Sequence, residues 1–324
     1  MTMQELARLA NVSVSTVSKA FCDANDVSSE TKQRIFEIAK KHGCYDHFYK
    51  GKYHKRVIAL IVPELASSYY TRFAECLQKI IEKNDCIVVI SCDHFNPNTQ
   101  AELIEYYTSY LKVDGIIVTN LYRPLKKNHF APIVALFICA DKSVDSIVVD
   151  WETTLTEAIQ VLKNHGHKHI VFLGEQLTFG KATSFQRLMS ASGFFNPHIY
   201  ESSFRFEKAG QDGVLHLLEK NIPFTAIVCA YDNIAFGAMK ELKKNGFSVP
   251  EDVSILGMDN IDMSQYTNSS LSSIGEDVEA FCDVVWDLLS KKIQKKTFYS
   301  CQQITLRGNL VLRESIADAK KGHH

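Results

Sequence analysis

The chain has 324 residues, 46% of them hydrophobic, and a formal net charge of −1, which suits a globular protein with a small head and a larger core of two lobes. No apolar run approaches the ~20 residues that a membrane helix needs, and no apolar segment follows a basic start at the amino terminus. We therefore expect a cytoplasmic protein with no membrane partner.

The nine cysteines show no sign of disulfide bonding or zinc binding. None belongs to a CxxC pair, and their spacings form no even ladder. Cys92 and Cys229 lie within apolar runs, where a free thiol behaves as a small hydrophobic side chain. The sequence therefore predicts no metal site and no cofactor.

Charge is unevenly divided along the chain. Residues 1–56 hold ten Lys/Arg against six Asp/Glu, a charge of +4, while the remainder holds 26 against 31, a charge of −5. A basic head suits polyanion binding, because phosphate contacts supply most non-specific affinity for nucleic acids. A solvated lysine-rich face is the plainer alternative.

The amino-terminal segment predicts two short helices separated by a sharp turn. Thr2 and Glu5 fit a capping box, which satisfies free amides at the start of a first helix. Asn11 stands at the turn, and Asn tolerates a left-handed backbone. Ser13 is expected to cap a second helix over Val14 to Phe21, and a third helix, capped by Ser28 and running to His42, supplies apolar support.

The second helix has a small polar face that can enter a DNA major groove. Val17 and Ala20 can pack inward, whereas the opposite side carries hydroxyls and one lysine, which reach phosphates and base edges. By spacing alone, an ordinary three-helix subdomain is nearly as good an interpretation.

A resemblance favours DNA binding. The run from Met3 to Phe21, MQELARLANVSVSTVSKAF, is similar to the head of the lactose and galactose repressor (LacI/GalR) family, whose pattern is xxVAxxAGVSxxTVSRxL. Two positions depart from that pattern: Asn11 replaces the turn glycine, and Lys19 replaces an arginine, which removes the bidentate fork to guanine. The resemblance implies base contacts from Val14, Ser15 and Lys19 and phosphate contacts from Ser13, Thr16 and Ser18.

Residues 46–56 are expected to form a hinge between a head, residues 1–45, and the core. The family's Tyr-x-Pro-Asn step and Ala-Arg-x-Leu helix are both missing here. The basic side chains Lys50, Lys52, Lys55 and Arg56 can still neutralise phosphates. Phe48, Tyr49 or Tyr53 could replace the family's leucine wedge in the minor groove. The alternative is a flexible tether whose aromatic side chains pack on the core.

From Val57 onward, apolar strand-like runs alternate with amphipathic helical stretches, which is typical of parallel sheets wound with helices. The predicted strands cover residues 57–62, 87–92, 115–118, 133–138, 169–174, 225–230 and 253–257. Ligands in such folds bind at the carboxyl ends of strands.

Motifs of enzymes are missing. The sequence contains no GxGxxG after a strand and no GxSxG elbow. The segment from Gly174 to Ala182 resembles a phosphate loop, but it has one residue too many and an alanine where Ser or Thr holds magnesium. His165, His167 and His169 match the family's GHxxI step, which favours a solvated turn over a metal site. We therefore predict no catalytic residues and no enzyme.

The resemblance extends to about Ser315, through the segments 113–118, 225–239, 246–260 and 306–315. It implies a periplasmic-binding-protein-like core of two Rossmann-like lobes, which the chain crosses near Asp150, Gly275 and Leu306. The amino-terminal lobe is expected to comprise residues 57–150 and 276–305, and the carboxy-terminal lobe residues 151–275 and 306–316.

The same resemblance implies an effector site between the lobes. Arg187 matches the arginine before the family's RxxGF step, Asp259 the first acid of its GxDD motif, and Tyr231 the usual asparagine. An arginine and a carboxylate facing one cleft suit a polyhydroxyl ligand. A surface salt bridge is the alternative role for Arg187.

Aromatic residues extend this expected site. Tyr69 and Tyr70 align with paired cleft aromatics, Trp151 stands at a family asparagine, and Phe179 follows a strand. Aromatic faces suit stacking on sugar rings, although simple packing explains each equally well. Phe137-Ile138 replaces the family's Asp-Arg step, so one common sugar contact is missing.

Together these patterns predict a homodimeric transcriptional regulator, a repressor, whose affinity for double-stranded operator DNA is switched by a small polar, sugar-like effector. A solute-binding protein without DNA activity and an enzyme on a doubly wound core are the alternatives. The head argues against the first, and the missing catalytic motifs argue against the second.

Overall fold

The structure is a computed structural model of the whole chain, and it describes all residues except 23, 49–54, 126–130, 296–300 and 321–324. It divides into two compact units. One consists of residues 1–56 with 85–87, and the other of residues 57–84 and 88–324. None of the described helices is long and apolar enough to cross a membrane.

The head is a three-helix bundle whose helices begin at the predicted caps, and the third ends at Lys41, one residue before the predicted His42. The Thr2–Glu5 capping box is present at the start of α1, and Asn11 has φ 51° in the turn that follows. Ser13 accepts the Thr16 amide, and Val17 and Ala20 are fully buried. The helices are α1 (Met3–Leu9), α2 (Val14–Phe21) and α3 (Ser29–Lys41), capped by Ser28.

A short fourth helix, α4 (Tyr45–Phe48), follows the bundle. Phe48 is buried in the head and lies 5.8 Å from the Phe21 ring, so in this structure its side chain packs on the head instead of standing free as a wedge. Tyr49, Lys50, Lys52 and Tyr53 lie outside the described residues.

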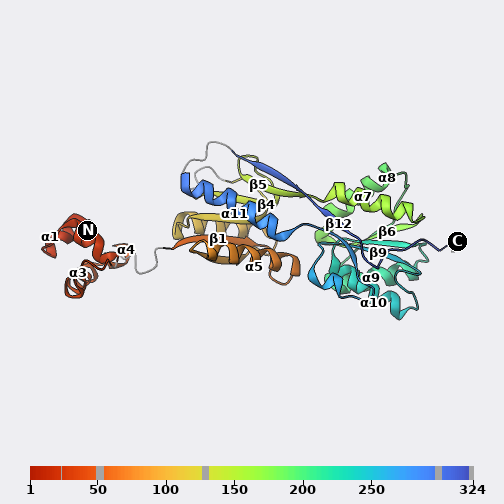
Figure 1. Cartoon of the computed structure of the whole chain (residues 1–324), viewed down its shortest axis with the longest axis horizontal. Helices are drawn as coiled ribbons and strands as arrows, with labels where there is room; N and C mark the ends of the chain where they lie inside the picture. The colour runs from red at the N-terminus through yellow and green to blue at the C-terminus, as the bar shows by residue number, and fades with distance from the viewer. Residues whose placement is uncertain (23, 49–54, 126–130, 296–300, 321–324) are drawn as a thin grey trace. The chain divides into compact units, whose positions relative to one another are not determined.

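The amino-terminal lobe is a six-stranded sheet in the order β11-β5-β4-β3-β1-β2, in which β11, β5, β4, β3 and β1 run parallel. Helices α5 and α11 cover one face (Figure 1), where Phe73 packs on Phe281, while α6 and the π-helix η1 pack against the other. Because both faces are covered, β1 and β3 are almost wholly apolar. The elements are β1 (Arg56–Val62), α5 (Ser68–Lys83), β2 (Cys86–Cys92), α6 (Pro97–Glu105), η1 (Tyr106–Leu111), β3 (Gly115–Leu121), β4 (Ile133–Cys139), β5 (Asp145–Asp150), α11 (Val278–Lys295) and β11 (Gln303–Arg307).

The carboxy-terminal lobe repeats this plan in the order β12-β10-β9-β8-β6-β7, with only β12 antiparallel to its neighbour. Helices α7 and α8 lie on one side of the sheet and α9 and α10 on the other (Figure 1). The elements are α7 (Trp151–Asn164), β6 (Ile170–Glu175), η2 (Gln176–Thr178), α8 (Phe179–Ala191), β7 (Ile199–Ser202), α9 (Phe206–Glu219), β8 (Ala226–Cys229), α10 (Asp232–Lys244), β9 (Ser254–Met258), η3 (Asp262–Gln265), β10 (Ser272–Gly275) and β12 (Asn309–Val311).

The chain passes between the sheets after β5, after β10 and between β11 and β12. The third crossing follows Arg307, because β11 includes Leu306 and pairs with β5 through Arg307. The lobe boundary expected between residues 305 and 306 therefore falls inside a strand.

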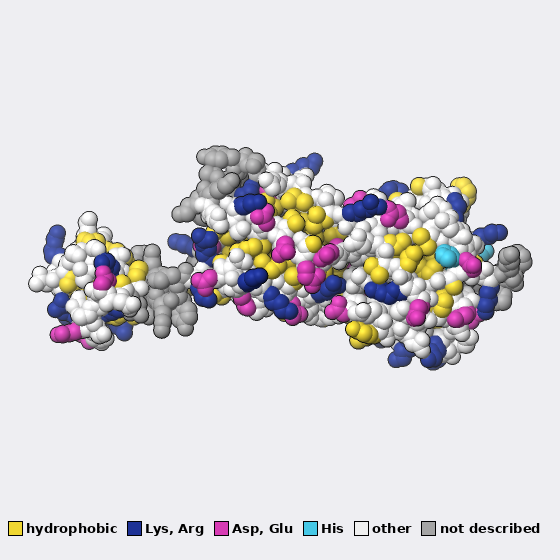
Figure 2. Space-filling view, in the orientation of Figure 1, with side chains coloured by type: hydrophobic (Ala, Val, Ile, Leu, Met, Phe, Trp, Pro, Cys, Tyr) yellow, Lys and Arg dark blue, Asp and Glu magenta, His cyan; other side chains and the backbone are white. Residues whose placement is uncertain are grey.

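Charged side chains of both signs are interspersed over the face of the core that Figure 2 shows. Small hydrophobic clusters lie between them. A mixture of this kind produces no extended field of one sign on that face. On this face, charge alone therefore marks no polyanion-binding surface.

Helices α9 and α10 touch backbone to backbone at two glycines. A Cβ added to Gly210 would lie 1.9 Å from the Ile234 carbonyl oxygen, and one added to Gly237 would lie 1.8 Å from the Glu207 carbonyl oxygen. A helix carbonyl cannot move aside as a flexible side chain can, so both positions require glycine.

We therefore predict that Gly237→Ala lowers the free energy of unfolding by about 3 kcal/mol or more, because the new methyl group forces the two helices apart. Urea denaturation measures it. Gly180→Ala is the matched control, since a Cβ there meets no atom within 4 Å. It should leave stability unchanged or raise it by up to about 1 kcal/mol. Equal losses in both variants would contradict the close-packing argument.

Candidate functional site

The six residues predicted to contact DNA lie together on α2 and its cap. Ser13, Val14, Ser15 and Lys19 are exposed, and Thr16 and Ser18 are half-buried. Ser13 accepts the Thr16 amide at 3.0 Å, so two of the expected phosphate contacts also hold the start of the helix. The face is small, polar and available on the surface of the head.

Lys19 has a partner within the head. Its Nζ forms an ion pair with Asp26, and the hydrogen bond from Lys19 lowers the pKa of the Asp26 carboxyl. Both side chains are about half exposed, at 50% and 56%. A base or phosphate that takes up Lys19 must therefore compete with a carboxylate.

Of the predicted hinge residues, Lys55 and Arg56 are described. Lys55 forms an ion pair with Asp85 at 2.8 Å, and Arg56 begins β1. Lys50 and Lys52 fall outside the described residues.

Asp259 lies at the carboxyl end of β9, and its partner is a lysine that sequence reasoning missed. Its Oδ1 is 3.3 Å from Lys181 Nζ, which also donates to the Ala230 carbonyl oxygen at 2.7 Å. Burial raises the pKa of Asp259 while Lys181 lowers it. Asp259 has φ 104°, a strained value for a residue with a side chain, and such strain concentrates at functional sites.

Arg187 has no described contact with Asp259. Its guanidinium is 59% exposed and pairs with Glu152 of α7 at 2.6 Å, which is the surface salt bridge named above as its alternative role. Lys181-Ala-Thr-Ser-Phe185 has the same spacing as the family's RxxGF step, six residues earlier, with Lys for Arg and Ser for Gly. The segment dismissed as a failed phosphate loop therefore supplies the cation.

Glu276, which follows β10, adds a second partly buried carboxylate. Burial, and then the nearby Asp259, raise its pKa to about 7, while a hydrogen bond with Tyr69 opposes that shift. Within the described structure its Oε1 is buried and has no hydrogen-bond partner. A buried acceptor without a donor is a place where a ligand hydroxyl would fit.

The amino-terminal lobe brings aromatic groups to the same end of its sheet. Tyr69 packs within 5.4 Å of both Tyr70 and Phe137, and the Tyr70 hydroxyl accepts a hydrogen bond from Asn120 at 3.2 Å. Burial raises the pKa of Tyr70 to about 12. Phe137, at φ 65°, stacks on Phe281. The missing Asp-Arg contact is thus replaced by an aromatic cluster.

Tyr231 follows β8 and belongs to a polar group that sequence reasoning did not find. Its hydroxyl donates to Glu175 at 2.7 Å and accepts the Phe206 amide at 2.9 Å. Arg205 contacts Glu175 and also Glu64 of the other lobe. No sequence motif includes Glu64, Glu175 or Arg205. These residues are far apart in the sequence and come together only in the folded protein.

Trp151 and Phe179 differ in their exposure. Trp151 begins α7 and packs in part against the core of the carboxy-terminal lobe. Phe179 begins α8 and is 67% exposed. Neither has a described contact with Asp259 or Glu276, so the structure does not bring them to the polar cluster.

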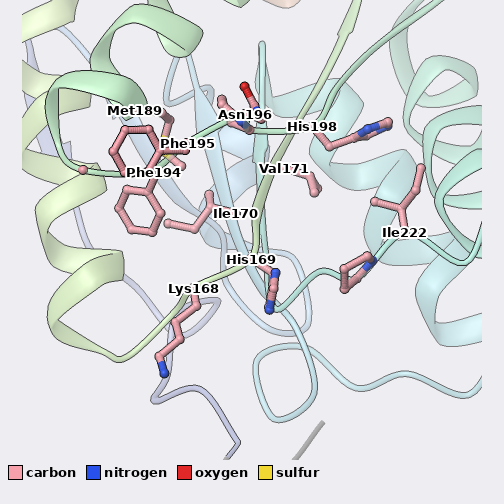
Figure 3. A pocket seen from close by; sticks show the side chains of 13 residues that line it. Lys168, His169, Ile170, Val171, Met189, Phe194, Phe195, Asn196, His198 and Ile222 are labelled. Carbon is pink, nitrogen blue, oxygen red and sulfur yellow. The ribbon is translucent and has the colours of Figure 1, made fainter. Parts of the chain in front are cut away.

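A separate hollow lies at the opposite edge of the carboxy-terminal sheet, where β6, β7 and β8 begin (Figure 3). Phe194, Phe195 and Met189 line one side of it, and His198 and Ile222 the other. Ligands of open α/β sheets bind at the carboxyl ends of strands, so the polar cluster is the better candidate despite this hollow.

Two of the three alternating histidines have described side-chain partners. His165 pairs with Asp318, and His167 is buried, with contacts to Thr225 and the Ala317 carbonyl oxygen. His167 is thus a packed histidine and not part of a solvated turn. Among the described residues, no group of three His, Cys, Asp or Glu side chains could hold a metal ion.

Comparisons with known proteins agree with both parts of the chain. The family model of bacterial regulatory proteins, lacI family, matches residues 2–45, and that of a periplasmic binding protein-like domain matches residues 159–316. The transcriptional repressor CytR of Escherichia coli K12 is 27% identical over 292 residues, covering 85% of this chain and 84% of CytR.

Two solved structures share the fold. The lac repressor dimer bound to operator and an anti-inducer has a TM-score of 0.74 at 19% identity, covering 98% of this chain and 99% of the repressor. A LacI family regulator of Enterococcus faecium with bound ribose has a TM-score of 0.71 at 20% identity, covering 82% of this chain and all of that one.

The partly buried Glu276 carboxyl predicts a pH dependence of stability. Because its folded pKa lies above that of the unfolded chain, the folded state binds the extra proton, and stability falls as pH rises from about 4.5 through 7. Glu276→Gln should remove up to about 1.4 kcal/mol per pH unit from that slope. Urea denaturation at pH 5, 6, 7 and 8 measures it. Glu102→Gln, at an exposed position, is the control, and an unchanged slope in Glu276→Gln would contradict the assignment.

Proposed function

Because the chain belongs to the LacI family of bacterial regulatory proteins, we propose that it is a transcriptional repressor switched by a small polar effector between its lobes. DNA binding and transcription regulation are properties of the family. The observation that carries the effector proposal is the cluster of Asp259, Lys181, Glu276 and Tyr69 at the carboxyl ends of strands from both lobes.

In this proposal α2 reads operator DNA. Val14, Ser15 and Lys19 contact bases, while Ser13, Thr16 and Ser18 contact phosphates. Lys55 and Arg56 add phosphate contacts beside the head. One recognition helix is too small for tight specific binding, so a homodimer presents two heads to a pseudo-palindromic operator.

The effector is proposed to be a sugar or sugar derivative. Asp259 and Glu276 accept hydrogen bonds from its hydroxyls, Lys181 donates to them, and Tyr69, Tyr70 and Tyr231 line the site. The ribose bound by the Enterococcus faecium regulator supports this class of ligand. Arg187 is left out, since its charge is taken up by Glu152 at the surface. Trp151 and Phe179 remain proposed stacking residues at the rim.

The protein is proposed to work in the cytoplasm, without a catalytic step and without a cofactor. The alternatives are a solute-binding protein and an enzyme on the same core. Loss of all DNA retention on deletion of residues 1–56 excludes the first, and turnover of a bound sugar by the full chain would revive the second.

For the head, we predict that Lys19→Ala weakens operator binding by about 1 to 3 kcal/mol and relaxes sequence preference, because a base-reading side chain is lost. Asp26→Asn should strengthen binding severalfold, since it frees Lys19 and removes a negative charge. Fluorescence anisotropy on operator variants measures both. A uniform loss across variants, with a salt slope lower by about one, would make Lys19 a phosphate contact instead.

For the core, we predict that Asp259→Asn and Lys181→Ala weaken effector binding at least tenfold, while Arg187→Ala leaves it unchanged. A thermal-shift panel of sugars, sugar phosphates and nucleosides identifies the ligand, and calorimetric titration with and without operator follows. Effector and operator must change each other's affinity by the same factor. Wild-type affinity in both site variants would place the ligand elsewhere, and an absent operator effect would exclude a ligand-switched repressor.

A further inference from the structure

Arg205, which precedes α9, contacts carboxylates from both lobes. Its two terminal nitrogens donate to the two oxygens of Glu64 at 2.8 Å each, and its Nε lies 3.2 Å from both oxygens of Glu175. Glu64 follows β1 in the amino-terminal lobe, whereas Glu175 ends β6 in the carboxy-terminal lobe. One guanidinium therefore joins the two lobes through a bidentate pair and a second carboxylate.

Two aromatic rings complete the surroundings of this guanidinium. Phe95 of the amino-terminal lobe lies 5.5 Å from it and Phe206 of the carboxy-terminal lobe 4.6 Å, both within the range of a cation–π contact. Tyr231 donates to Glu175 and so orients that carboxylate. The guanidinium is thus held by charge and by aromatic faces from each lobe.

The bridge is shielded from water. The side chains of Glu64 and Glu175 are 13% and 4% exposed, and that of Arg205 is 35% exposed. A bidentate arginine–carboxylate pair is stronger than a neutral hydrogen bond and strongly directional, and partial burial reduces screening by salt. The pair of Arg187 and Glu152 within the carboxy-terminal lobe is, by contrast, exposed to solvent.

The two arms of the bridge have different roles. The arm to Glu175 stays within the carboxy-terminal lobe and fixes the guanidinium there. The arm to Glu64 crosses to the other lobe. A second cross-lobe contact, from Arg72 to the Asn260 carbonyl oxygen at 2.9 Å, involves a neutral acceptor. Arg307 of β11 also pairs with Glu157 of α7, but these side chains are 66% and 44% exposed, so the pair of Arg205 with Glu64 is the more buried of these two charged contacts between the lobes.

We propose that Arg205 is a positioning residue that holds the two lobes together before any effector binds, as an internal substitute for a ligand between them. If the closed arrangement is already populated without ligand, an effector that binds it loses less free energy in closing the lobes. The same arrangement sets the operator affinity of the ligand-free protein. The closure itself is independent of the proposed function, and its effects on effector and operator rest on that function.

The test uses the full chain, with donor and acceptor dyes on unnatural amino acids at Glu102 of the amino-terminal lobe and Lys240 of the carboxy-terminal lobe. Both positions are exposed and lie outside the proposed site. Single-molecule energy transfer then reports the separation of the lobes without added ligand. Glu64→Gln is the main variant, because it removes the cross-lobe charge and leaves Glu175 paired with Arg205.

We expect one high-transfer population in the wild type and at least a threefold loss of that population in Glu64→Gln. Arg205→Lys keeps the charge but loses the fork, so an intermediate loss is expected. Glu152→Gln, which removes the partner of Arg187 inside one lobe, should behave as the wild type. A wild-type distribution in Glu64→Gln, or an equal loss in Glu152→Gln, would overturn the proposal.

Operator affinity without ligand separates this inference from the proposed function. If Glu64→Gln separates the lobes and also changes operator affinity, both stand. If the lobes separate while operator affinity stays at the wild-type value, Arg205 positions the lobes as proposed, but lobe arrangement does not control the head.

Discussion

The parallel direction of the strands is the constraint on which the core depends. It collects the carboxyl ends of five strands of each lobe at one edge, where the chain must leave the sheet and turn. Several non-glycine residues at or near these strand ends have a left-handed backbone, as Asn120, Phe137 and Asp259 do. Such residues are strained and persist only where packing determines them. The sheet thus brings together polar groups that lie far apart in the sequence.

Not every buried acid at this edge is available to a ligand. Asp232 accepts hydrogen bonds from Ser264, Ser273 and the Ile261 amide, and it ties the loop after β9 to α10. Burial raises its pKa to about 7 even so. Asp259 and Glu276 have fewer donors, and repulsion by Asp259 adds to the desolvation that raises the pKa of Glu276. The difference in hydrogen bonding, and not burial alone, separates the structural acid from the candidate ligand groups.

Local signals predicted the parts of the structure that depend on local physics. The caps at Thr2, Ser13 and Ser28 gave the head helices to within a residue, and long buried strands such as β1 were found from their apolar runs. The strands β5, β7, β10, β11 and β12 were missed, because none of them contains an apolar run longer than three residues. The sequence comparison matched Arg187 to the family's arginine, whereas Lys181, six residues earlier, is the cation that contacts Asp259. The bridge of Arg205 needs partners 30 and 141 residues away, and no local pattern records it.

Three cations of the head and the cleft already have carboxylate partners. Lys19 is paired with Asp26, Lys181 with Asp259, and Arg205 with Glu64 and Glu175. Binding at any of them is then an exchange of partners, so a ligand gains only the difference between the new contact and the old one. A poorly matched ligand gains no binding free energy from such an exchange. A ligand that forms hydrogen bonds with both the cation and the released carboxylate keeps the full free energy of its new contacts. Internal pairing therefore lowers affinity but sharpens discrimination, which suits a regulator that must distinguish among many sites and related small molecules.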